Sequence, residues 1–223
     1  MQKKRFYTEL AYIIGLLTLA FSTAMMTKAD FGLSMVVAPA YLLHAKLYPT
    51  LPFFTFGMAE YIFQAALLLL MICIVRRFRV KYIFAFVTAV LYGLLLDLSL
   101  SVLSFLPTNL LAVRILLFVV GLVVCSFGVA CMFHTYLAPE VYELFVKEVS
   151  DRYHFSISKC KTVYDCASCL LAIVLSFAFF GFGTFIGVKW GTVVCALVNG
   201  FLIGRISAFL EKHFSFVDLL KRK

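Results

Sequence analysis

The sequence contains long apolar runs of about 20 residues that few charged side chains interrupt. A helix of this length crosses a hydrocarbon core about 30 Å thick at about 1.5 Å per residue. Helices are required because lipid offers no partner to free backbone groups, and runs such as 65–75 and 115–124 do not alternate as barrel strands do. The predicted spans are 9–27, 57–75, 82–104, 110–134, 162–186 and 189–210.

Composition supports the same conclusion. Of 223 residues, 64% are hydrophobic and only 14% are charged, so the chain lacks the polar shell that a soluble domain needs. The predicted fold class is therefore all-α, a polytopic membrane protein with about six transmembrane helices, in direct contact with the lipid bilayer.

The net charge of +9 follows the predicted topology. If the spans alternate in direction, sixteen Lys and Arg residues fall on one side and only Lys28, Lys46, Arg114 and Lys189 on the other. This is the positive-inside asymmetry, and it predicts six crossings with cytoplasmic N- and C-termini. The basic residues are thereby accounted for without a nucleic-acid partner.

The chain also matches itself at an offset of 106 residues. Each matched span is followed by a short helical segment, 34–48 or 139–153. With three crossings per half, the repeats 1–106 and 107–223 would be inverted relative to each other, as in many secondary transporters. We therefore expect the first span to be retained, although it has features of a signal peptide. The matched pairs are Gly15 with Gly121, Leu16 with Leu122, Phe21 with Phe127, Ala24 with Ala130 and Met26 with Met132.

Short motifs lie at the ends of the predicted spans. They are Ala-Asp-Phe-Gly-Leu-Ser at 29–34, Thr-Phe-Gly at 55–57, Gly93-x-x-x-Asp97 and Gly187-x-x-x-Gly191-Thr192. In these motifs, and over nearly the whole chain, the sequence resembles the YczE/YitT-type bacterial integral membrane proteins. The resemblance implies the fold and the bacterial cell membrane, and it supplies no substrate.

Polar residues inside an apolar span need a partner, water or a function, since burying a charge in lipid costs about 2.5–3.5 kcal/mol. Asp97 lies about fifteen residues into the third span and is predicted either to line a polar cavity or to cap a helix at the interface. Asn199, near the middle of the sixth span, is predicted to bind a ligand or to hydrogen-bond another helix.

Two further pairs share a helix face because their members are four residues apart. Glu60 and Gln64 open the second span, and Lys161 and Asp165 open the fifth. The pairs would flank a central pathway from opposite membrane faces, or they would be interfacial residues at helix starts. The predicted substrate-binding residues are Asp97, Glu60, Gln64, Asp165 and Asn199.

The short segment 34–48, interrupted by Pro39, is predicted to be a re-entrant half-helix or an amphipathic interfacial helix. Its counterpart 139–153 carries many charges, which favours the interfacial position for at least one half. His44 and His134 are expected to be interfacial side chains and carry no mechanism.

No catalytic or cofactor-binding motif occurs in the sequence, so we predict no enzyme, no cofactor and no metal. The spacing of Cys166-x-x-Cys169 fits a redox or metal pair, but no second pair accompanies it. We interpret the seven cysteines as small apolar residues.

The function predicted from these features is small-molecule transport by alternating access between the two repeats. Carboxylates outnumber cations among the buried candidates, which favours a cationic or zwitterionic substrate or proton coupling. Two alternatives stay open: a membrane scaffold or regulatory partner acting through its cytoplasmic surface, and a substrate-binding subunit of a larger transporter. A homo-oligomer or a membrane-protein partner is compatible with each.

Overall fold

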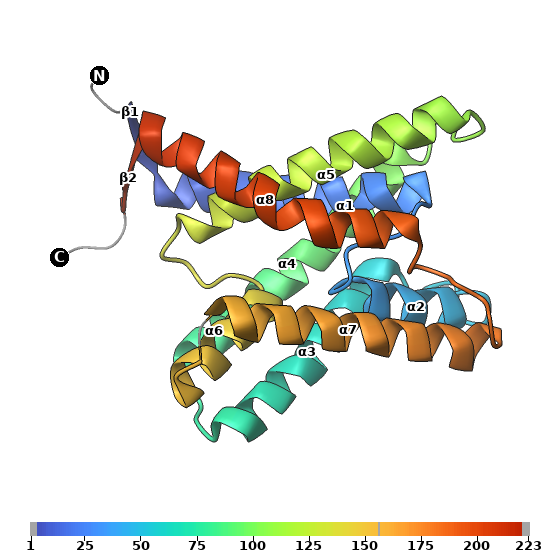
Figure 1. Cartoon of the computed structure of the whole chain (residues 1–223), viewed down its shortest axis with the longest axis horizontal. Helices are drawn as coiled ribbons and strands as arrows, with labels where there is room; N and C mark the ends of the chain where they lie inside the picture. The colour runs from blue at the N-terminus through green and yellow to red at the C-terminus, as the bar shows by residue number, and fades with distance from the viewer. Residues whose placement is uncertain (1–3, 156, 220–223) are drawn as a thin grey trace.

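The structure is a computed structural model that describes residues 4–155 and 157–219, without the side chains at 157 and 158. Eight helices and two short strands lie in this part of the chain (Figure 1). They are β1 (Lys4–Tyr7), α1 (Thr8–Ala29), α2 (Ala38–Leu47), α3 (Phe56–Val75), α4 (Val80–Leu103), α5 (Leu111–Phe133), α6 (Val141–Tyr153), α7 (Ile157–Phe180), α8 (Trp190–His213) and β2 (Phe214–Val217).

The predicted fold class is confirmed. Six helices are long and apolar enough to cross a membrane: α1, α3, α4, α5, α7 and α8. Leu69, Leu116, Leu170 and Leu197 point outward from four of them, each more than 60% exposed, as lipid-facing side chains do. The chain is a multi-pass membrane protein.

The fifth span is displaced from its predicted position. It was expected over 162–186, but α7 covers Ile157–Phe180. Gly181 and Gly183 follow with φ of 98° and 85°, a left-handed backbone that stops a helix and that glycine adopts without strain.

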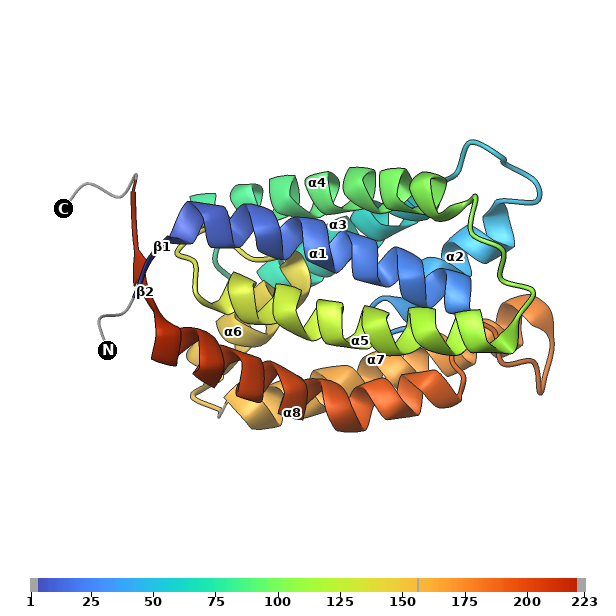
Figure 2. The same cartoon turned by 90° about the horizontal axis from the view of Figure 1, so that it is seen from above.

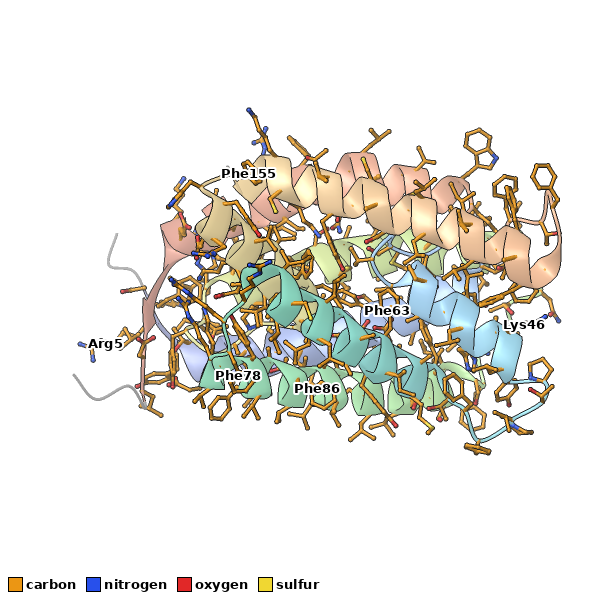
Figure 3. The ribbon with its side chains drawn as sticks, turned by 90° about the horizontal axis from the view of Figure 1, so that it is seen from below. Arg5, Lys46, Phe63, Phe78, Phe86 and Phe155 are labelled. Carbon is orange, nitrogen blue, oxygen red and sulfur yellow. The ribbon has the colours of Figure 1, made fainter. Side chains whose placement is uncertain are left out.

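Both termini lie at one end of the helix bundle (Figures 1 and 2). There β1 pairs in parallel with β2, so that Lys4 stands beside Phe214. We call this the terminal end. The opposite end, which carries α2 and the loops 104–110 and 181–189, is the distal end, and Figure 3 shows Arg5 and Lys46 at these two ends. Six passages return the chain to the end where it started.

The order of elements is a long helix, a short helix and two long helices, and this order occurs twice. Helices α1 and α5 pack along each other in the centre, where Gly15 and Gly121 allow close approach. Around them α4 packs against α1, and α8 packs against α5.

Each short helix packs against longer ones, α2 against α3 and α7. Pro39 lies in the first turn of α2 and does not interrupt it, which corrects the sequence interpretation: its missing N–H is harmless in a first turn. The apolar face of α6, formed by Val141, Leu144 and Val146, is buried against α3, α4 and α7. Its charged residues Lys147 and Asp151 face outward, so α6 is held by protein on one side only.

Candidate functional site

A cavity of about 120 Å³ lies in the centre of the bundle. Its walls include Thr23 from α1, Tyr92 from α4, Cys125 from α5 and Asn199 from α8. The segment that enters α6 contributes Glu140. Residues from both halves of the chain therefore surround one small space.

Buried carboxyl groups lie beside this cavity. The side chain of Glu60 has no exposed surface, and its Oε2 accepts hydrogen bonds from Tyr142 Oη at 2.7 Å and from Gln64 Nε2 at 3.4 Å. Gln64 Oε1 accepts the backbone N–H of Val141 at 3.1 Å. Glu140 is 6% exposed and lines the cavity directly. The first turn of α6 is thus bound to α3 through polar contacts.

One oxygen of each carboxyl group lacks a partner. Oε1 of Glu60 and Oε1 of Glu140 are buried and accept no hydrogen bond from any described residue. Buried polar atoms are almost always hydrogen-bonded, so unsatisfied ones mark strain or an unfilled binding site. The two oxygens are the clearest sign of a ligand site in this chain.

Burial raises the pKa of Glu140 well above its ordinary value, and the negative charges of Glu143 and Glu60 raise it further, while a hydrogen bond from Gln64 opposes them. Burial also raises the pKa of Glu143, and the positive charge of Lys161 opposes this shift. The carboxyl groups here ionise readily only if positive charge comes close.

Two predicted residues meet at the edge of the cavity. Lys161 lines it, and Lys161 Nζ lies 2.9 Å from Asp165 Oδ1 and 5.5 Å from the centre of the Tyr164 ring. Asp165 therefore contacts the site through Lys161.

Asn199 lines the cavity from α8, and its Oδ1 accepts a hydrogen bond from Ser126 Oγ at 2.8 Å. Both functions considered for Asn199 are thus compatible with its position: it joins α8 to α5, and it borders the cavity.

The cavity continues toward the terminal end. A second hollow of about 570 Å³ shares Met132, Pro139, Glu143 and Lys161 with it and adds Lys81 and Lys147. The shared side chains place the two spaces next to each other, with the second hollow on the side toward the terminal end.

At the distal end the loop before α2 contributes Leu33 and Ser34 to the cavity wall and is hydrogen-bonded to the loop before α8. The N–H of Leu33 donates to the Gly187 carbonyl at 3.0 Å, and the N–H of Gly191 donates to the Phe31 carbonyl at 2.8 Å. A Cβ on Gly191 would lie 2.5 Å from the same carbonyl oxygen, so only glycine permits this approach.

An ion cluster covers these backbone contacts. Asp30 Oδ1 lies 2.6 Å from Lys189 Nζ, and Asp30 Oδ2 lies 3.3 Å from a guanidinium nitrogen of Arg114. The Arg114 guanidinium also stacks 4.9 Å from the centre of the Phe31 ring. We call the backbone contacts and this cluster, residues 30–33, 114 and 187–191, the distal seal.

Asp97 lies apart from the cavity. Its Oδ1 accepts the backbone N–H of Gly57 at 2.8 Å, at the first turn of α3. Thr55 Oγ1 accepts the N–H of Met58 in the same turn. This geometry is that of a helix cap, the alternative to a cavity residue that the sequence left open.

Of the five predicted residues, only Asn199 lines the cavity. Glu60 and Gln64 lie behind its wall, where Glu60 contacts Tyr142 and Gln64 contacts the backbone of Val141. Sequence reasoning missed Glu140 and Tyr142. It treated 139–153 as one charged segment, although the period of its apolar residues separates a buried face from a charged one.

A family model matches residues 6–208, and its description is "Family of unknown function (DUF6198)". The chain belongs to this family. The match includes every residue named around the cavity and the distal seal of this DUF6198 protein. Nothing in it ties the chain by name to the YczE/YitT-type proteins. No curated protein and no solved structure matches the chain.

Proposed function

We propose that this DUF6198 protein transports a small molecule across the bacterial cell membrane, with its termini in the cytoplasm. Transport would proceed by alternating access between the repeats 1–106 and 107–223, related by inverted topology as the offset in the sequence predicts. The YczE/YitT resemblance supports the cell membrane in this proposal and contributes no activity.

One observation supports the proposal: a central cavity with unsatisfied carboxyl groups adjoins a larger hollow toward one end of the bundle, and toward the other end it is bordered by a loop that is hydrogen-bonded to a second loop. A transporter between transport steps has this asymmetry. The seal consists of two backbone hydrogen bonds and a partly exposed ion cluster, and contacts of this kind can break and re-form.

A scaffold or subunit function would use the cytoplasmic surface 139–161 and 214–223, of which residues 156 and 220–223 lie outside the described residues. The apolar residues Val141, Leu144 and Val146 of that surface are already buried within the chain. Less apolar area is then left for a partner, which favours transport.

The test is uptake by liposomes that contain the purified protein, with a panel of small amines, amino acids, sugars and carboxylic acids. We expect uptake of at least one class, and a loss of at least tenfold in Glu140→Gln and in Glu60→Gln. Glu148→Gln is the matched control, because Glu148 is a buried glutamate of α6 that does not line the cavity.

Normal uptake by both cavity variants would refute the proposed site, and no uptake of any class would refute transport by this chain alone. Co-purification in mild detergent then distinguishes the alternatives, since a stoichiometric partner would indicate a subunit or a scaffold.

A further inference from the structure

The surroundings of the central cavity carry more negative than positive charge. Glu140 and Glu143 line it, and Glu60 lies behind Tyr142. The cation in the lining is Lys161, which already forms an ion pair with Asp165 at 2.9 Å. No ion pair within the described residues reaches Glu60, Glu140 or Glu143.

A hydrogen-bond donor is also missing. Glu140 is 94% buried, lines the cavity, and leaves its Oε1 without a partner; Oε1 of Glu60, behind the cavity wall, is in the same condition. Burying a carboxylate oxygen without a hydrogen-bond donor costs free energy, because the oxygen loses its hydrogen bonds to water and gains none from the protein. A ligand that brings both a positive charge and N–H donors would remove both costs.

The remaining walls select an organic cation. Tyr92 and Tyr142 present aromatic rings, and Met26 and Met132 present thioether side chains, all suited to the polarised methylene groups beside an ammonium nitrogen. Within the described residues no three His, Cys, Asp or Glu side chains converge as ligands of a metal ion would. The volume of about 120 Å³ suits a small occupant.

We propose that the central cavity binds a small organic ammonium ion, whose N–H groups donate to Oε1 of Glu140 while its short apolar part contacts Tyr92 and Tyr142. Glu60 acts as a positioning residue: it holds Tyr142 and Gln64 in place and adds negative charge from behind the wall. The inference rests on the proposed function only in that the bound ammonium ion would be the transported substrate.

The test measures binding to the purified protein in detergent, and so needs no transport. The probes are methyl-, ethyl- and propylammonium, with propanol and propionate as matched neutral and anionic molecules and Na⁺ and Mg²⁺ as inorganic cations. We expect calorimetric binding of the alkylammonium ions alone. Removing a charge-assisted hydrogen bond should weaken it about 10- to 100-fold in Glu140→Gln.

Two further variants separate the functions of the glutamates. In Glu60→Gln the hydrogen bond to Tyr142 can persist, so we expect a smaller loss of ammonium affinity than in Glu140→Gln. Glu60→Ala should lose more affinity than Glu60→Gln. Glu148→Gln should bind as the native chain does. Equal binding of propanol, stronger binding of propionate, or unchanged affinity in Glu140→Gln would overturn the ammonium site.

The outcomes also separate this inference from transport. Ammonium binding without uptake into liposomes would leave the site standing and remove the transport function. Uptake of a neutral or anionic molecule without ammonium binding would support transport and refute the ammonium site.

Discussion

The last two long helices of each half pack in different ways. In the first half α3 and α4 cross at Gly57 and Gly93, where a Cβ on Gly93 would lie 2.7 Å from the Gly57 carbonyl oxygen, and Asp97 caps α3 beside the crossing. In the second half α7 and α8 do not pack along each other within the described residues. A Cβ on Gly200 or Gly204 would meet no atom within 4 Å.

The glycines in the last long helix of each half therefore have different surroundings: Gly93 touches the backbone of α3, and Gly200 faces open space. Helix α8 is also the least buried span, at 11% of its apolar window against 33% for α4. Helices α3 and α4 are thus closely packed against each other, whereas α7 and α8 are apart.

The largest effect is expected at the contact between α3 and α4, which we call the closed pair. Gly93→Ala forces apart two backbones in contact and should lower the free energy of unfolding by about 1–3 kcal/mol. Gly200→Ala is the matched control. It fills open space and replaces a glycine inside a helix, so it should raise stability by about 0.5–1 kcal/mol. Thermal unfolding in detergent measures both, and equal losses would contradict the difference between the halves.

A smaller effect is expected at the cap of the closed pair. Asp97→Ala removes the acceptor of the Gly57 N–H and should cost about 0.5–2 kcal/mol. Asp97→Asn keeps an acceptor and should cost less. Both variants should retain uptake in proportion to the folded protein. A loss of uptake in a fully folded Asp97→Asn would instead return Asp97 to the substrate site.

The smallest effects should be the pH responses of α6, which bridges the closed pair and the cavity. At its end toward α4, burial raises the pKa of Glu148, but hydrogen bonds from Lys81 and Tyr82 and the charges of Lys81 and Arg79 outweigh burial and lower the pKa below its ordinary 4.5. The stabilisation is therefore present above pH 4.5 and is lost as the pH falls through the lowered value. Solvent screens it, because Arg79 and Lys81 are 51% and 39% exposed.

At the cavity end of α6 the pKa shift has the opposite sign. The pKa of Glu140 is raised from 4.5, chiefly by burial and by the charges of Glu143 and Glu60. A raised pKa in the folded chain means that stability present below pH 4.5 is lost as the pH rises through the raised value.

Unfolding measured as a function of pH checks both signs. Glu148→Gln should remove the loss of stability at low pH, and Glu140→Gln should remove the loss of stability at high pH. Propylammonium should also reduce the loss at high pH in the native chain but not in Glu140→Gln. If neither substitution changes the slope of the unfolding free energy against pH, other groups set the pH dependence.

Parts of the candidate site could be predicted from the sequence. Glu60 and Gln64 were predicted because two polar residues four apart in an apolar span must face the same neighbour. Glu140 could not be predicted from its own position, since it precedes a short helix rich in charge and nothing local shows that α3 and α7 enclose that helix. Asp97 was ambiguous because its depth in a span does not say whether a helix start lies beside it.

The six membrane-crossing helices follow from the apolar runs alone, because backbone groups in lipid must bond within their own segment. The sequence does not show which carboxyl groups meet, that the central cavity adjoins a second hollow toward the terminal end, or that α3 and α4 pack closely while α7 and α8 are apart. These features depend on contacts between residues far apart in sequence, such as Glu60 with Tyr142, and local apolar patterns carry no information about them.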